Sequence, residues 1–389
     1  MTRHLPTPDS YDYEWVALSD ARFAPDTGLI RLSWPDTTML DVHPTWVAEN
    51  TPVTGYDTVV NEGILDVREA PTPSDVAAVT IDDEGALAVT WSDGGSSKLH
   101  PGWLRHIAEN KHLPDSFLPD RTKWTATDLA EPISVDGSDV LGDSGALEEW
   151  LSALVGYGLA RLVDAPTDPD FLLDLMKHVG PIRGSNFGDL FSVRIHESPD
   201  SLAYTGLNLG QHTDLPTREI PPGFQFLHCI ENTVEGGWSR MTDGLALIDE
   251  LQTNHADHYE ALTTLDWVWF NRQHNDDHRW VGPVIDHGGP HSPVTFRAFY
   301  PVRSFPAMDS RDVSRAYAAL CCLNDVAHDE RFQMRFAFRP GDIVGFDNRR
   351  VFHGRDGFDP GGGGRHLRGC YLDSDDILSR TRVLRRRTQ

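Results

Sequence analysis

Four side chains of this sequence have the types and the order that a catalytic metal site needs. His212 and Asp214 lie in the segment GQHTDLP, His353 lies in RRVFHGR, and Arg365 lies in GRHLRG. Two imidazoles and one carboxylate are the ligand set of a mononuclear non-haem Fe(II) oxygenase. A guanidinium offers a paired donor surface to a carboxylate, so the arginine suits an acidic co-substrate. If the four side chains converge, they predict oxygenase chemistry.

The His-x-Asp pattern alone does not select the ligands. It occurs three times, as His212/Asp214, His255/Asp257 and His274/Asp276. The second and third copies lie in very polar stretches that are typical of exposed helices or loops. The first copy follows a glycine and precedes a predicted pair of strands. Alternate residues of a strand face the same side, so this copy can present both of its ligands to one metal.

Two arginines compete for the acidic co-substrate. Arg365 and Arg368 both lie on a predicted strand and are separated by two residues. Residues at this spacing face opposite sides of a strand, so only one of them can point inward. The spacing does not decide which one does.

The second half of the chain reads as many short strands. Apolar runs alternate with turn residues from Phe224 onward, as in FQFLHCI, FRAFYPV, FQMRFAF, DIVGFDN and RHLRGCYL. Helical periodicity is confined to residues 144–157, 169–179 and 310–328, and a strand is expected at 159–163. This pattern predicts a mainly β fold with flanking helices, either a barrel or a double-sheet jelly roll. The C-terminal RVLRRRTQ is expected to be a solvated end.

The first hundred residues contain an internal repeat. Residues 28–46 and 85–103 share a tryptophan, an aspartate and a His-Pro-x-Trp motif, in which His43 corresponds to His100. The repeat predicts a small β-rich N-terminal domain at residues 1–108, and each histidine is expected to have a structural role. A polar, proline-bearing linker is expected at 109–130, followed by a jelly-roll oxygenase domain at 131–389.

Composition narrows the class of protein. The chain has 389 residues and a net charge of -25, which argues against nucleic acid and anionic membranes as partners. No run of eighteen apolar residues and no apolar leader is present, so we expect a cytoplasmic protein. The four cysteines show no metal-binding or redox spacing and are expected to be reduced: Cys229, Cys321, Cys322 and Cys370.

Four segments resemble a known family. GQHTDLP, ENTVEGGWSRMTDGL, NRRVFHGR and GRHLRGCYLD are similar to the γ-butyrobetaine hydroxylase branch of the Fe(II)/2-oxoglutarate dioxygenases, which is related to the taurine dioxygenases. The resemblance covers nearly the whole chain and is looser at the N-terminus. It implies a double-stranded β-helix (jelly roll) that uses Fe(II), 2-oxoglutarate and O2, and relatives that are often homodimers.

The same resemblance assigns roles to individual residues. His212, Asp214 and His353 match the iron ligands. Arg365, rather than Arg368, matches the arginine that binds the distal carboxylate of 2-oxoglutarate, and Ser239 occupies the place of a nearby hydroxyl. Related halogenases carry a small residue in place of the aspartate, so the carboxylate of Asp214 favours hydroxylation.

The substrate pocket of the family contains an aromatic cage for a trimethylammonium group. The matching residues here are all aromatic: Phe187, Phe191, Tyr204 and Tyr371. Such a cage holds a cation by cation–π attraction. The alternative is that these are ordinary core aromatics, and the spacing of Phe187 and Phe191 also suits one face of a helix.

Two departures from the family pattern limit the resemblance. Family members bind a structural zinc through cysteines and a histidine, and no structural zinc is predicted here because other residues stand in those places: Thr51, Val53, Tyr56 and Gly95. Ser201 and the stretch Phe299-Tyr300-Pro301 stand where the family carries asparagines that hold the substrate carboxylate. A substrate other than γ-butyrobetaine is therefore expected.

The sequence thus predicts an oxygenase that hydroxylates an unactivated C–H bond of a small substrate, with a quaternary ammonium compound or an amine favoured. One alternative is an uncharged natural-product intermediate that is hydroxylated, desaturated or cyclised by the same cofactors. A remote alternative is a non-catalytic, cupin-like protein that binds a metal structurally.

Overall fold

The chain forms two compact units. The computed structural model describes residues 5–9, 11–195, 205–271, 275–289 and 293–387. The units comprise Met1–Ser116 and Phe117–Gln389, so their boundary falls inside the expected linker. The end of that linker belongs to the second unit, because Trp124 is buried there and its backbone N–H donates to Asp243. Each unit is described by itself below.

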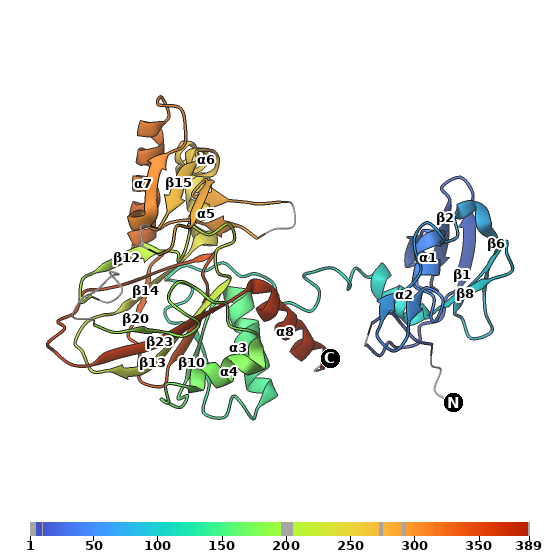
Figure 1. Ribbon diagram of the computed structural model, residues 1–389, viewed down its shortest axis with the longest axis horizontal. Helices are drawn as coiled ribbons and strands as arrows, with labels where there is room; N and C mark the ends of the chain where they lie inside the picture. The colour runs from blue at the N-terminus through green and yellow to red at the C-terminus, as the bar shows by residue number, and fades with distance from the viewer. Residues whose placement is uncertain (1–4, 10, 196–204, 272–274, 290–292, 388–389) are drawn as a thin grey trace. The chain divides into compact units, whose positions relative to one another are not determined.

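The N-terminal unit is built from two copies of one motif (Figure 1). Each copy is an antiparallel three-stranded sheet followed by a short helix. The first comprises β1 (Asp20–Ala24), β2 (Leu29–Ser33), β3 (Met39–Val42) and α1 (Pro44–Glu49). The second comprises β6 (Val76–Ile81), β7 (Leu87–Trp91), β8 (Ser96–Leu99) and α2 (Pro101–Ala108). The short pair β4 (Tyr56–Asp57) and β5 (Glu62–Gly63) lies between them in the sequence.

The repeated histidines begin the two helices. The Nδ1 atom of His43 accepts a hydrogen bond from the N–H of Thr45, and that of His100 accepts from the N–H groups of Gly102 and Trp103. Each ring therefore satisfies amide groups that the first turn of a helix leaves unpaired. The expected structural role of both histidines is confirmed.

Two antiparallel sheets form the body of the second unit. The larger has the order β11-β23-β13-β21-β10-β9, in which only β9 and β10 run parallel, and the smaller has the order β12-β22-β14-β20. The larger contains β9 (Ile133–Asp136), β10 (Leu159–Val163), β11 (Phe191–Val193), β13 (Phe224–Asn232), β21 (Ile343–Asp347) and β23 (Arg365–Leu372). The smaller contains β12 (Leu209–His212), β14 (Ser239–Asp243), β20 (Met334–Phe336) and β22 (Val351–Arg355). The expected mainly β architecture with helices is confirmed.

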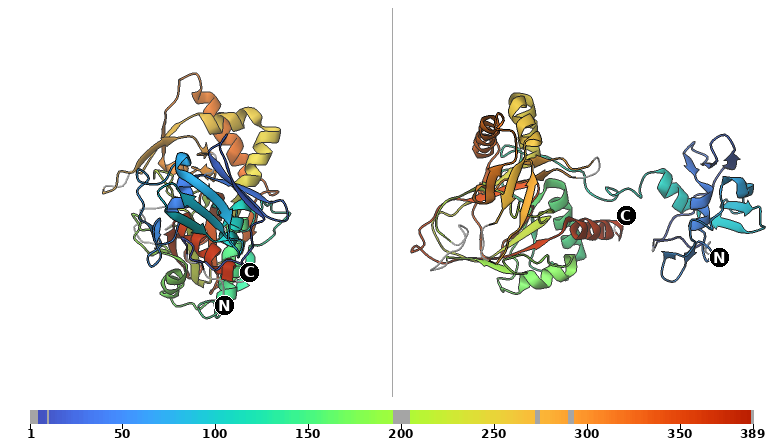
Figure 2. Two further views of the ribbon diagram at one scale, coloured as in Figure 1. Left: turned by 90° about the vertical axis from the view of Figure 1, so that its right-hand side faces the viewer. Right: turned by 45° about the horizontal axis from the view of Figure 1, so that its top comes forward.

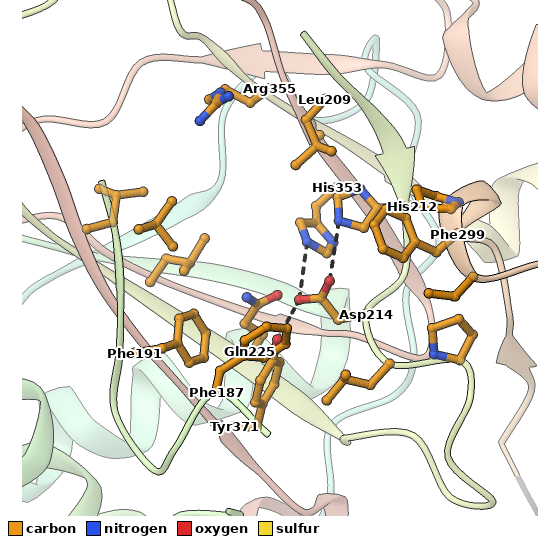
Figure 3. A pocket seen from close by; sticks show the side chains of 18 of the residues that line it. Phe187, Phe191, Leu209, His212, Asp214, Gln225, Phe299, His353, Arg355 and Tyr371 are labelled. Carbon is orange, nitrogen blue, oxygen red and sulfur yellow. Dashed lines mark hydrogen bonds and ion pairs between the residues drawn. The ribbon is translucent and has the colours of Figure 1, made fainter. Parts of the chain in front are cut away.

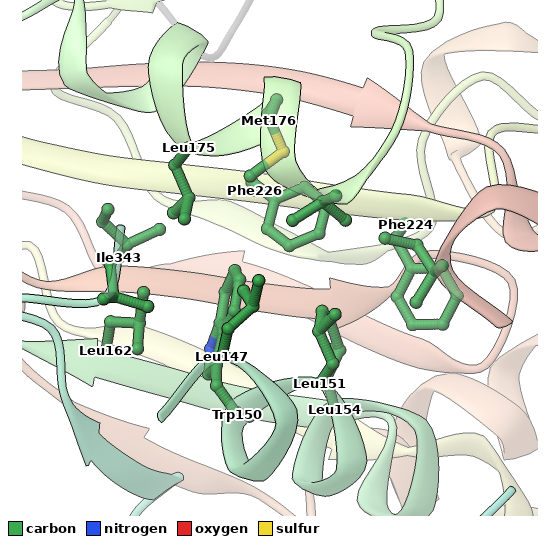
Figure 4. Packing of buried hydrophobic residues seen from close by; sticks show 14 of the residues in the cluster. Leu147, Trp150, Leu151, Leu154, Leu162, Leu175, Met176, Phe224, Phe226 and Ile343 are labelled. Carbon is green, nitrogen blue, oxygen red and sulfur yellow. The ribbon is translucent and has the colours of Figure 1, made fainter. Parts of the chain in front are cut away.

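Helices α3 (Ser144–Tyr157) and α4 (Phe171–Val179) cover the outer face of the six-stranded sheet (Figure 4), and α8 (Ser374–Arg387) packs against both helices. Trp150 and Leu154 of α3 pack with Leu175 of α4 against Phe226 of β13, and all four side chains are fully buried. The prediction of a solvated C-terminal end is wrong, because Leu384 of α8 is buried in this cluster. Charged residues dominate the end of α8 and obscured its single apolar stripe.

The remaining helices form a separate layer in the same unit (Figures 1 and 2). α5 (Gly244–Asn254), α6 (Ala256–Thr264) and α7 (Val313–His328) pack with the small sheet of β15 (Trp267–Phe270), β16 (Arg279–Gly282) and β19 (Arg303–Pro306). The short pair β17 (Ile285–Asp286) and β18 (Thr295–Phe296) completes this layer. His255 is the residue before α6 and Asp257 lies in its first turn, so the second His-x-Asp copy lies at the start of a helix, as expected. His274 of the third copy lies outside the described residues. Within the described ranges, no helix is both long and apolar enough for a bilayer.

A buried ion pair connects the end of β14 to the turn before β22. Arg350, immediately before β22, donates from Nε and Nη2 to the two carboxylate oxygens of Asp243 at 2.8 and 2.9 Å. The guanidinium also donates to the carbonyl oxygens of Gly156 and Thr122. Four segments of the second unit therefore meet at one guanidinium.

We predict that Asp243→Asn destabilises the second unit by about 3–5 kcal/mol, because it leaves the buried charge of Arg350 without its counter-charge. Asp174→Asn is the matched control, since it removes one partner of an exposed pair with Lys177 and should change stability by less than about 1 kcal/mol. Urea unfolding followed by circular dichroism measures both. Equal stability of the two variants would show that the buried pair does not hold the unit together.

Candidate active site

The three expected metal ligands converge between the sheets of the second unit (Figure 3). His212 ends β12 and lies opposite His353 of β22 in the strand register, and Asp214 follows two residues after His212. His212 Nε2 lies 3.3 Å from Asp214 Oδ1, and His353 Nε2 lies 3.7 Å from Asp214 Oδ2. Candidate ligand atoms of the three residues all lie within 4.8 Å of one another. Among the described residues, this is the one group of its kind.

The protonation of these groups suits a cation. His212 Nδ1 lies 2.9 Å from the carbonyl oxygen of Gly210, a contact in which this nitrogen donates, and Nε2 is the ring nitrogen that faces Asp214. Burial, with His212 alongside, lowers the pKa of His353 to about 3, so this ring is neutral at physiological pH. Burial opposes ionisation of Asp214, but the imidazoles and the Tyr371 hydroxyl outweigh it and hold the pKa of Asp214 below its usual range.

The donor set therefore fits a divalent metal. The Nε2 atoms of His212 and His353 face the carboxylate oxygens of Asp214, and a cation between them would bind all three groups. Metal binding requires neutral imidazoles and an ionised carboxylate. Two histidines and one carboxylate leave several coordination positions for other molecules, which is the arrangement of non-haem Fe(II) oxygenases.

A cavity of about 390 Å³ adjoins the three ligands. Arg365 on β23 and Ser239 on β14 both line it. The backbone enters β14 through Gly236 and Gly237, whose φ angles of 86° and 61° favour glycine. This tight turn brings the backbone beside Arg365.

Arg365 is a buried cation without a counter-charge in the part of the chain that the structure describes. Its side chain is buried, its Nε has no hydrogen-bond partner, and no carboxylate forms a salt bridge with it. Burial lowers its pKa to about 10. Arg368 instead donates to the Ser192 hydroxyl on the neighbouring strand and does not line the cavity. The strand alternation expected from the sequence therefore separates the two arginines, and Arg365 is the one that meets the cavity.

Three aromatic rings form one wall of the cavity. Phe191 lies on β11, and its ring centroid is 6.4 Å from that of Phe187 and 5.2 Å from that of Tyr371. The alternative of a helix face for Phe187 and Phe191 is wrong, because the chain turns after Phe187 and continues as a strand. Ser201 and Tyr204 lie outside the described residues.

The opposite part of the lining is also apolar. The ring of Phe299 packs against that of His212, with centroids 4.7 Å apart, and Pro301 and Val302 follow it along the wall. Tyr300, between Phe299 and Pro301, is 61% exposed and does not line the cavity. The stretch that replaces the expected asparagines therefore contributes apolar surface.

Gln225 is a polar residue of the cavity that the sequence motifs do not include. This residue lies on β13 beside Tyr371 of β23, lines the cavity, and has a buried Oε1 atom without a partner among the described residues. A signal was present, because Gln225 is a lone amide in the apolar strand FQFLHCI. Its neighbours Phe224 and Phe226 face the helices, so the glutamine must face inward. A buried amide oxygen of this kind favours a ligand that can donate a hydrogen bond.

The chain is similar to known dioxygenases. Residues 120–371 match the family described as "Taurine catabolism dioxygenase TauD, TfdA family". The chain is 38% identical to a γ-butyrobetaine dioxygenase of Pseudomonas sp. (strain AK-1) over 364 residues, which cover 92% of this chain and 94% of that protein. It is 30% identical to the human γ-butyrobetaine dioxygenase, covering 79% and 81%, respectively. It is 26% identical to the mitochondrial trimethyllysine dioxygenase of Rattus norvegicus, covering 78% and 73%.

Among solved structures, an asparagine oxygenase in complex with Fe(II), 3-hydroxyasparagine and succinate aligns with a TM-score of 0.49 at 18% identity, covering 59% of this chain and 79% of that one. The family match and the curated relatives set aside the alternative of a non-catalytic metal-binding protein. The chain belongs to the TauD/TfdA family, and it is an Fe(II)- and 2-oxoglutarate-dependent dioxygenase that is related to the γ-butyrobetaine dioxygenases.

Proposed function

We propose that this enzyme hydroxylates an unactivated C–H bond of a small organic cation, with Fe(II) held by His212, Asp214 and His353. The observation that carries the proposal is the aromatic wall of the cavity, which lies next to the three ligands. The faces of aromatic rings attract cations. Among the described residues of the lining, Asp214 is the only carboxylate, so the rings are left to recognise the cation.

The co-substrate site is proposed at Arg365 and Ser239. A buried guanidinium without a counter-charge is unfavourable, and a carboxylate of 2-oxoglutarate supplies the missing charge. The hydroxyl of Ser239 offers a further hydrogen bond to the same group. When bound, iron supplies the oxidising chemistry with dioxygen and 2-oxoglutarate, while the protein orients the substrate and excludes water.

The names of the relatives support a cationic substrate. γ-Butyrobetaine and trimethyllysine are both quaternary ammonium compounds. We propose a substrate other than γ-butyrobetaine itself, because Phe299 and Pro301 give the cavity apolar surface at the stretch where the family resemblance places an asparagine. Ser201 and Tyr204 belong to this proposed substrate site as positions inferred from sequence.

A panel of substrates tests the proposal. Trimethylammonium compounds and amines should stimulate succinate formation from 2-oxoglutarate, and matched neutral compounds with a tert-butyl group should stimulate it far less. Phe191→Leu should raise KM for the cations about 2- to 30-fold, which corresponds to the loss of one cation–π contact, and should change KM for the neutral compounds less. Equal stimulation by neutral and cationic compounds would refute the cation site.

An uncharged natural-product intermediate is the second candidate substrate. The apolar lining at Phe299, Pro301 and Val302 favours it. Stimulation by neutral compounds alone would support it. The product mass then identifies the reaction, since hydroxylation adds one oxygen atom, whereas desaturation or cyclisation removes two hydrogen atoms.

We predict that Asp214→Ala abolishes both turnover and retention of Fe(II), because it removes the only anionic ligand. Asp257→Ala is the matched control, since it alters the His-x-Asp copy on α6 and should leave both properties at the wild-type level. Metal content after anaerobic dialysis is the measurement. Retention of iron by Asp214→Ala would show that the ligands are elsewhere.

We predict that Arg365→Gln raises KM for 2-oxoglutarate by about 10- to 160-fold, because it removes charge-assisted hydrogen bonds that contribute about 1.5–3 kcal/mol. Arg368→Gln should leave this KM unchanged, since Arg368 lies on the other side of β23. Succinate formation at varied 2-oxoglutarate concentrations separates the variants. The assignment fails if Arg368→Gln has the larger effect.

We also propose that the enzyme is cytoplasmic and forms a homodimer. All four cysteines are free, which agrees with a reducing compartment such as the cytoplasm. A homodimer is proposed from the resemblance alone, and light scattering of the purified protein distinguishes it from a monomer.

A further inference from the structure

Asn348 holds the backbone of Asp214 on both sides. The side-chain Oδ1 of Asn348 accepts from the N–H of Asp214 at 2.7 Å, and its Nδ2 donates to the Asp214 carbonyl oxygen at 3.0 Å. The same Nδ2 donates to the carbonyl oxygen of Pro222 at 3.2 Å. Asn348 is fully buried and lies in the turn that connects β21 to the strand of His353. One amide thus connects the segments that carry two of the proposed ligands.

The chain around Asp214 needs such external support. Leu215 has a φ angle of 52°, in the left-handed region that residues other than glycine rarely adopt. Such a conformation costs about 1–3 kcal/mol and persists only where the surroundings enforce it. Thr213, which precedes Asp214, is anchored to the segment at Phe296 and Ala298. Its hydroxyl donates to the carbonyl oxygen of Phe296, and its N–H donates to the carbonyl oxygen of Ala298. Asp214 therefore occupies a bend that Thr213 and Asn348 hold in place.

The carboxylate of Asp214 is fixed separately from its backbone. The hydroxyl of Tyr371 donates a hydrogen bond of 2.7 Å to Asp214 Oδ2 (Figure 3). Tyr371 comes from β23 of the other sheet, and its ring is buried against Phe191 in the aromatic wall. Rotation of the carboxylate away from the histidines would break this bond. The ring of Tyr371 therefore belongs to the aromatic wall, while its hydroxyl contacts a proposed metal ligand.

We propose that Tyr371 and Asn348 are positioning residues that set the Asp214 ligand in place before a metal binds. Asn348 fixes the position of the Asp214 backbone, and Tyr371 fixes the orientation of the Asp214 carboxylate. The Asp214 carboxylate is then already ordered when the metal binds, and this preorganisation strengthens metal binding. The same hydroxyl connects the metal centre to the aromatic wall that faces the substrate.

Tyr371→Phe is the direct test, because it removes one hydroxyl and keeps the ring. Titration of the apoenzyme with Co(II) under argon, followed by calorimetry, should show a dissociation constant about 10- to 100-fold higher than that of the wild type, as is typical when a partner of a metal ligand is removed. The absorption spectrum of bound Co(II) should also change, which a purely structural role of the hydroxyl would not produce.

Tyr259→Phe is the matched control. It removes a tyrosine hydroxyl that makes a bond of the same length, 2.7 Å, to His287 in the helical layer. Its affinity for Co(II) should equal that of the wild type. Asn348→Asp keeps an acceptor for the Asp214 N–H and loses the donor to the carbonyl oxygens, so it should also weaken Co(II) binding.

The outcomes separate this inference from the ligand assignment on which it rests. Asp214→Ala must lose Co(II) binding if the three ligands are as proposed. If Asp214→Ala loses the metal and Tyr371→Phe binds it as tightly as the wild type, the positioning role of Tyr371 is wrong and the ligand assignment stands. If Asn348→Asp folds and binds Co(II) like the wild type, the role of Asn348 is wrong.

Discussion

The alternation of side chains along the strands of the two facing sheets is the constraint on which the site depends. On β13, Phe226 packs against the outer helices, while Gln225 faces the cavity. On β23, Leu372 joins the outer core, while Arg365 and Tyr371 face inward. Each strand thus contributes to the hydrophobic core through one face and to the chemistry through the other. A register shift of one residue would bury the wrong set on both sides.

The two sheets contribute different residues to the site. The four-stranded sheet carries His212 and His353, and the six-stranded sheet carries Arg365 and Tyr371. The hydrogen bond between Tyr371 and Asp214 joins the two sets across the interior. Gln225 Oε1 and Arg365 Nε are buried in this interior without a hydrogen-bond partner among the described residues, which would be unfavourable in a protein without ligands. Their presence is explained by a metal, an acidic co-substrate and a substrate that share one cavity.

Much of the site could be predicted from the sequence because its residues follow local rules. The helix at 144–157, the strand at 159–163 and the opposite directions of Arg365 and Arg368 follow from periodicity, whereas only the family resemblance selected Arg365 as the inward residue. Other features depend on contacts between distant segments. Asn348 reads as an ordinary turn residue, and only the fold shows that its amide clamps Asp214. The packed helix α8 was missed because its arginines outnumber the few apolar residues that face the core.

A structure of the enzyme crystallised without oxygen, with Mn(II) and 2-oxoglutarate, tests the central claim most directly. We expect an anomalous scattering peak for an Mn(II) ion that is coordinated by His212 Nε2, a carboxylate oxygen of Asp214 and His353 Nε2. We also expect the distal carboxylate of 2-oxoglutarate on the guanidinium of Arg365. A metal bound elsewhere, or a distal carboxylate on Arg368, would contradict the claim.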